Sequence, residues 1–114
     1  MIEALWSVEF VSNAQDFGAG MVVLETGRAL GGDNQYSYVG TYKPDPTGVV
    51  HAEVLISHYF GPGHSIFGQL KQFTVHLSGK PEYDSFTMQG DVAGQPNMRV
   101  TVRFTRRAEL PNPP

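Results

Sequence analysis

The rest of this chain is arranged around one stretch, Gly31-Gly32-Asp33-Asn34-Gln35-Tyr36-Ser37-Tyr38-Val39-Gly40-Thr41-Tyr42. The two leading glycines predict a tight turn, because glycine adopts positive φ at little cost. Alternation along the strand that follows places Tyr36, Tyr38 and Tyr42 on one face. Gly40 inside that strand predicts a bend, since an interior glycine usually marks a bulge, a bend or a close backbone approach at a barrel corner.

Strand patterns continue on both sides of this stretch. Residues 3–12 and 21–26 are expected to form a hairpin, residues 28–30 a short segment, and residues 49–60, 73–77, 85–92 and 98–105 further strands. No helical period is long enough to cover a sheet, so about eight strands must protect their edges by closure. The sequence predicts one all-β domain over residues 1–110, an eight-stranded antiparallel barrel, followed by a Pro-rich tail at 111–114.

The inward face of the predicted barrel is aromatic and β-branched. Aromatic rings with polar tips suit a cavity that holds an amphipathic ligand, and they equally suit a filled core. Both interpretations stay open, and the filled core is favoured for so short a chain. The candidate cavity-lining residues are Trp6, Phe10, Tyr36, Tyr38, Tyr42, Val54 and Phe104.

Composition excludes several classes of protein. The chain has 114 residues, no cysteine and a net charge of −3. These values argue against disulfides, thiolate zinc sites, cysteine catalysis and a duplex-binding surface. Arg99, Arg103, Arg106 and Arg107 cluster near the end, and they are expected on a solvated strand face. No export signal or apolar span is recognised, so a cytoplasmic location without membrane or direct nucleic-acid contact is expected.

No catalytic motif stands out. The histidines lack the spacing of a zinc-hydrolase motif, and the carboxylates lie at turns and strand ends, where acids usually serve as solvating groups. No enzyme activity, metal or cofactor is predicted. His51, Glu53 and His76 form a weak alternative as a metal site if their strands are adjacent. The loop over residues 61–68 is interpreted as a plug of the core, with a contact or lid loop as the alternative.

Four short motifs carry a family resemblance. Phe10-Val11-Ser12-Asn13, Gly18-Ala19-Gly20, Gly31-Gly32-Asp33 and Tyr38-Val39-Gly40 resemble the GrlR-like family of negative regulators of type III secretion, over roughly the first half of the chain. The resemblance implies a cytoplasmic bacterial protein with a lipocalin-like up-and-down barrel. It also implies a homodimer that regulates transcription by binding an activator protein rather than DNA.

The resemblance directs attention to one turn. An acidic run after the glycine strand carries the activator contact in this family, and the matching positions here are Lys43-Pro44-Asp45-Pro46-Thr47. Only Asp45 is acidic, so most of the charge complementarity is missing. The expected partner-binding residues are Lys43, Asp45 and Thr47. Homodimerisation is also expected from an apolar outer face that includes Val49 and Leu55. The alternative function is a barrel that binds a small apolar ligand.

Overall fold

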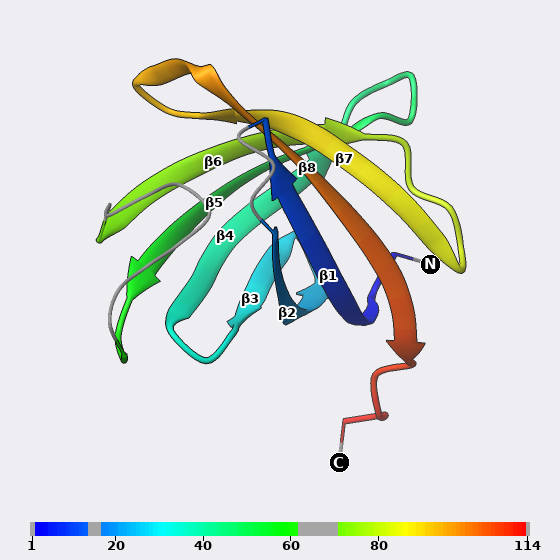
Figure 1. Ribbon diagram of the computed structural model, residues 1–114. Coiled ribbons are helices and arrows are strands. Elements are labelled where there is room, and N and C mark those ends of the chain that lie inside the picture. The colour runs from blue at the N-terminus through cyan, green and yellow to red at the C-terminus, as the bar shows by residue number, and fades with distance from the viewer. Residues whose placement is uncertain (1, 14–16, 62–70, 114) are drawn as a thin grey trace.

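The computed structural model describes residues 2–13, 17–61 and 71–113, which form a closed β-barrel (Figure 1). Each strand pairs antiparallel with the next in the chain, and β8 pairs with β1. The predicted all-β, eight-stranded up-and-down barrel is therefore confirmed. The strands are β1 (Ala4–Ser12), β2 (Phe17–Glu25), β3 (Arg28–Gly32), β4 (Tyr36–Pro44), β5 (Val50–His58), β6 (Gln72–Gly79), β7 (Ser85–Val92) and β8 (Gln95–Ala108).

Residues 2–13, 17–61 and 71–113 contain no helix that is long and apolar enough to cross a bilayer.

Alternation along the strands sorts side chains into an inner and an outer set, as expected for a pleated sheet. Val8 on β1 lies opposite Phe104 on β8, and Phe104 lies opposite Phe86 on β7. All three side chains are buried. The same alternation directs Val50, Ala52, Val54 and Ile56 of β5, and Val100, Val102 and Phe104 of β8, into the interior.

The turn before β4 differs from the prediction. Gly31 and Gly32 belong to β3, and neither has a positive φ. A Cβ atom at Gly31 would lie 2.0 Å from the carbonyl oxygen of Met21 on the neighbouring strand. Glycine is therefore required for a close approach of two strands, whereas the turn itself begins at Asp33.

Gly40 lies at a similar close approach. A Cβ atom there would lie 2.2 Å from the carbonyl oxygen of Glu53 on β5. Such contacts are tolerated only without a side chain, and they allow a short sheet to curve into a closed barrel.

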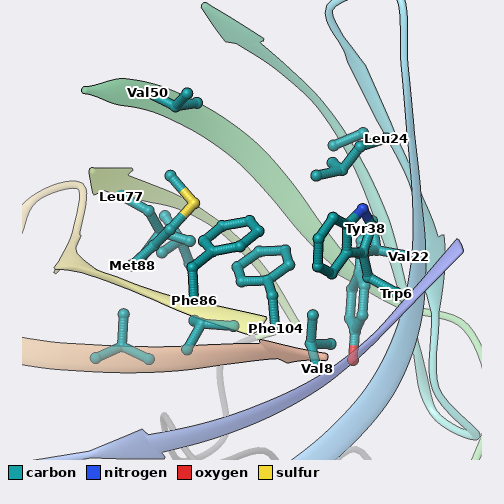
Figure 2. Packing of buried hydrophobic residues seen from close by; sticks show 14 of the residues in the cluster. Trp6, Val8, Val22, Leu24, Tyr38, Val50, Leu77, Phe86, Met88 and Phe104 are labelled. Atoms are coloured by element: carbon teal, nitrogen blue, oxygen red, sulfur yellow. The ribbon is translucent and has the colours of Figure 1, made fainter. Parts of the chain in front are cut away.

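One side of the interior is filled by aromatic rings from β1, β7 and β8 (Figure 2). Phe86 and Phe104 stack with ring centroids 4.7 Å apart. The Trp6 ring meets Phe86 edge-on at 4.9 Å. Arg106 continues the inward row of β8, and its guanidinium carbon lies 4.7 Å from the Trp6 centroid and 3.9 Å from that of Tyr83. The prediction of a solvated face is wrong for Arg106, because its side chain is only 8% exposed.

Candidate ligand-binding cavity

The rest of the interior is a cavity of about 440 Å³. This volume lies within the range of roughly 300–1,000 Å³ that is typical of small-molecule sites. Val50, Ala52, Val54 and Ile56 of β5 all line it, so β5 forms much of one wall. Across the described residues the lining is mostly aliphatic and aromatic, with a few polar side chains at one end.

Six of the seven predicted lining residues lie around this cavity. They are Phe10, Tyr36, Tyr38, Tyr42, Val54 and Phe104. Trp6 does not line it. Its indole Nε1 donates a hydrogen bond to the carbonyl oxygen of Ile2 at 2.9 Å, and Phe86 and Arg106 cover its ring. Trp6 therefore belongs to the packed side of the interior.

Two glycines of β2 make room for aromatic rings at the cavity wall. A Cβ atom at Gly18 would lie 2.3 Å from the Phe10 ring, and one at Gly20 would lie 2.5 Å from the Tyr38 hydroxyl oxygen. The two rings meet edge-on with centroids 6.1 Å apart. The Gly18-Ala19-Gly20 motif therefore allows the rings of Phe10 and Tyr38 to pack against the sheet. The motif is itself part of β2, which begins at Phe17 and not at the predicted Met21.

Asp33 organises the polar end of the cavity. Its Oδ1 accepts hydrogen bonds from the backbone N–H groups of Gln35 at 2.8 Å and Tyr36 at 2.7 Å. Its Oδ2 accepts a hydrogen bond from the Tyr38 hydroxyl at 2.6 Å. An aspartate that caps the backbone two and three residues later forms an Asx-type turn. The carboxylate thus fixes the turn before β4 and also anchors an inward ring of β4.

Burial and the Asp33 carboxylate both act on Tyr38. Desolvation is the larger cause, the hydrogen bond to Asp33 the next, and together they raise the pKa of Tyr38 far above its usual value. The phenol therefore remains a hydrogen-bond donor to Asp33 over the whole physiological range. Figure 2 shows the Tyr38 oxygen directed away from the stacked rings of Phe86 and Phe104.

Gln35 supplies a further acceptor. Its side-chain Oε1 is buried and makes no hydrogen bond with the described residues. A buried oxygen without a donor costs free energy of about 1–3 kcal/mol, so a ligand donor would be favoured there. Sequence reasoning missed Asp33, Asn34 and Gln35 as lining residues. The usable signal was an aspartate followed directly by an alternating strand, which predicts a capped turn whose side chains face the barrel mouth.

The turn between β4 and β5 is built on a second aspartate, Asp45. Its Oδ1 accepts hydrogen bonds from the Thr47 N–H at 2.8 Å, the Thr47 hydroxyl at 2.6 Å and the Val49 N–H at 3.1 Å. Its Oδ2 lies 2.9 Å from His51 Nε2. The Thr47 hydroxyl first, and His51 next, hold the pKa of Asp45 well below its usual value. Of the predicted contact residues, Lys43 and Thr47 are exposed, and Asp45 is occupied by its own turn.

The candidate metal ligands are only partly brought together. Glu53 and His76 lie on adjacent strands with Oε2 and Nε2 3.2 Å apart, whereas His51 pairs with Asp45 instead. Within the described ranges, no group of three histidine, cysteine, aspartate or glutamate side chains is arranged to hold a metal ion.

An apolar row crosses the outer face of the barrel. Val23, Leu30, Val39 and Leu55 lie directly opposite one another on β2, β3, β4 and β5. Leu30, Val39 and Leu55 are exposed by 43%, 53% and 38%. We call these four residues the outer ladder. The predicted apolar face thus includes Leu55, whereas Val49 lies in the turn before β5 and is half-buried.

The loop over residues 61–68, interpreted as a plug or lid, lies outside the described residues except for Gly61. Comparison of the sequence with models of known protein families gives no match, and comparison with curated proteins gives none either.

Proposed function

We propose that this protein is a non-catalytic binding barrel that holds one small, mostly apolar molecule in its interior. The cavity of about 440 Å³ is the observation that supports this proposal. Side chains could have filled the space, as Trp6, Phe86 and Phe104 fill the other side. Instead the wall opposite them carries alanine and valine, which leave room for a guest.

The size of the cavity limits the ligand and its affinity. At about 30 Å³ per water-sized group, the space holds roughly 15 non-hydrogen atoms. Micromolar affinity requires about 8 kcal/mol, or roughly 0.5 kcal/mol per atom, which lies within the range known for ligands of this size. A compact molecule of this kind is therefore a sufficient ligand.

Native mass spectrometry of the purified protein, with added apolar compounds of about 10–15 atoms, tests this function. We expect one bound molecule per chain. Val54→Phe places a ring in the cavity and is expected to reduce binding, whereas Leu55→Phe, on the outer face of the same strand, is the matched control. Absence of any bound or competing compound on the wild-type protein would contradict the proposal.

A second function is favoured by the outer ladder: binding of a protein, and first of all a second copy of this chain. This proposal keeps the regulatory role suggested by the GrlR resemblance and moves its contact from the 43–47 turn to the sheet face. Large apolar side chains exposed in one row commonly mark interaction surfaces. Asp45, with its carboxylate engaged by Thr47, Val49 and His51, offers little to a basic partner.

Charge favours a second copy as the occupant. The row beside the ladder sets Arg28 on β3, Thr41 on β4 and Glu53 on β5 directly opposite one another. A two-fold axis along β4 would place Leu30 over Leu55 of the other copy and Arg28 over its Glu53. Such a face is self-complementary, as a two-fold interface must be.

Sedimentation equilibrium tests the second function. We expect a dimer at micromolar concentration for the wild type and a monomer for Val39→Glu, which places a charge at the centre of the ladder. Thr87→Glu, at an exposed position of β7 away from the outer ladder, is expected to stay dimeric. A monomeric wild type would exclude self-association through this face.

A further inference from the structure

We infer that the ligand carries a cationic hydrogen-bond donor on an apolar body, in other words that the cavity takes a small apolar amine. This inference rests on the proposed interior binding function. It concerns the chemistry of the polar end of the cavity, which Asp33, Gln35 and Tyr38 line.

Charge is the first argument. Of the described residues that line the cavity, Asp33 is the only one with a charged side chain. No lysine, arginine or histidine is among them, so a ligand carboxylate or phosphate would meet no positive partner. Asp33 is half-buried, and a carboxylate in such a position attracts a cation more strongly than one in bulk water, because the surrounding medium screens it less.

Hydrogen-bonding capacity is the second argument. A carboxylate offers about four acceptor sites. Asp33 uses two on Oδ1 and one on Oδ2, which leaves one site on Oδ2 beside the Tyr38 hydroxyl. Gln35 Oε1 is a second acceptor without a donor among the described residues. An ammonium group has three N–H donors and no acceptor, which suits a site with two acceptors to satisfy.

The surroundings of Asp33 also suit an ammonium group. Phe10 and Tyr38 meet edge-on with centroids 6.1 Å apart, and Tyr36 lies near Phe73 at 6.4 Å, all four lining the cavity. Aromatic faces attract cations, most strongly where water is excluded. The other described lining residues are mostly aliphatic, so they can bury an alkyl or aryl body.

Isothermal titration calorimetry of a matched series on the wild-type protein tests the inference. Decylamine, decanol and decanoate share one apolar body and differ in the head group. We expect decylamine to bind about tenfold more tightly than decanol, because a charge-assisted hydrogen bond is stronger than a neutral one. Decanoate is expected to bind more weakly than decanol, since its charge repels Asp33.

Matched variants locate the preference. Asp33→Asn keeps an acceptor for the turn and removes the charge, so the amine and the alcohol are expected to bind about equally. Asp45→Asn makes the same change in the other turn and is expected to keep the wild-type order. Should Asp33→Asn fail to fold, Tyr38→Phe serves instead: it frees a second acceptor site on Asp33 Oδ2 and is expected to increase the preference for the amine. An unchanged or smaller preference would show that Asp33 does not bind the amine.

The outcomes separate the two proposals. Equal binding of the three compounds, or tighter binding of decanoate, would overturn the inference of an amine ligand and leave the binding function standing. Absence of binding by all three, together with no uptake of a neutral fluorescent apolar probe, would overturn both.

Discussion

The two turns that flank β4 are each stabilised by an aspartate, but only the first aspartate also contacts the interior of the barrel. Asp33, before the strand, caps the N–H groups of Gln35 and Tyr36 and receives the hydroxyl of Tyr38 from inside the barrel. Asp45, after the strand, caps Thr47 and Val49 and meets His51 on the outside. In both turns Oδ1 accepts hydrogen bonds from backbone N–H groups that follow the aspartate. Oδ2 of Asp33 contacts a side chain inside the barrel, whereas Oδ2 of Asp45 contacts a side chain on the outside.

That difference shows how a turn becomes part of a site. At Asp45 four contacts engage the carboxylate, three on Oδ1 and one on Oδ2, and this aspartate is not among the residues that line the cavity. At Asp33 three contacts leave one acceptor site, and this site lies at the polar end of a cavity. Asp33 therefore both stabilises its turn and offers an acceptor to a ligand, whereas Asp45 only stabilises its turn.

The largest effect is expected from alanine at Asp33. Asp33→Ala leaves two backbone N–H groups and the buried Tyr38 hydroxyl without their acceptor, which should lower the free energy of unfolding by about 3 kcal/mol. Urea unfolding followed by the fluorescence of Trp6, the single tryptophan, measures this change. Asp45→Ala, in the exposed turn, is the matched control and should cost clearly less. Equal losses for the two variants would show that the turns contribute alike.

A smaller loss is expected when Tyr38 is displaced and Asp33 is left intact. In Gly20→Ala the new Cβ would lie 2.5 Å from the Tyr38 hydroxyl oxygen and 2.9 Å from the Gly32 carbonyl oxygen, so the ring must shift away from Asp33 and the neighbouring strand must give slightly. Overpacking of this kind usually costs about 1–3 kcal/mol. Gly18→Ala displaces the Phe10 ring instead and serves as the control for general crowding. The Asp33–Tyr38 bond matters to stability only if Gly20→Ala costs more than the loss caused by crowding at Gly18.

The sequence was sufficient for the architecture and for most of the cavity wall. Alternation is a local property, so the inward faces of β1, β4, β5 and β8 could be predicted from the chain alone. Whether an inward residue faces a cavity or a packed cluster depends on its neighbours across the barrel. Trp6 illustrates this limit, because its surroundings are set by Phe86 and Arg106, which lie far along the chain.

Glycines and acids were harder to interpret. Gly31 and Gly32 suggested a turn, but the contact that requires glycine at position 31 comes from Met21 on the neighbouring strand. At Asp45 the contacts with Thr47 and Val49 are local, whereas His51 comes from β5. The partners of Gly31 and the pairing of His51 with Asp45 depend on strand register, which alternation alone does not specify.

Alkaline pH offers a sharper test of the inner turn. The pKa of Tyr38 is raised by burial and then by Asp33, so the folded protein keeps this phenol protonated while the unfolded chain ionises near pH 10. The stability contributed by Tyr38 is therefore full below about pH 10 and falls as pH rises beyond it. By about pH 11 the loss should reach roughly 1 kcal/mol. Compared with the wild type, Tyr38→Phe should unfold more easily at neutral pH but lose less stability between about pH 9 and pH 11. If the variant loses as much stability over this range as the wild type, the loss comes from other tyrosines.

The smallest effect is expected for the outer turn in acid. The Thr47 hydroxyl, and then His51, lower the pKa of Asp45, so its contribution to stability is present above about pH 4 and is lost as pH falls further. Asp45→Asn should therefore show a lower urea midpoint than the wild type near pH 6, and the two proteins should converge toward about pH 2. Thr47→Ala removes the largest cause of the lowered Asp45 pKa, so in that background the difference in urea midpoint between proteins with and without Asp45→Asn at about pH 6 should be smaller. A difference between the wild type and Asp45→Asn that stays constant down to the lowest pH would mean that the carboxylate charge adds nothing to this turn.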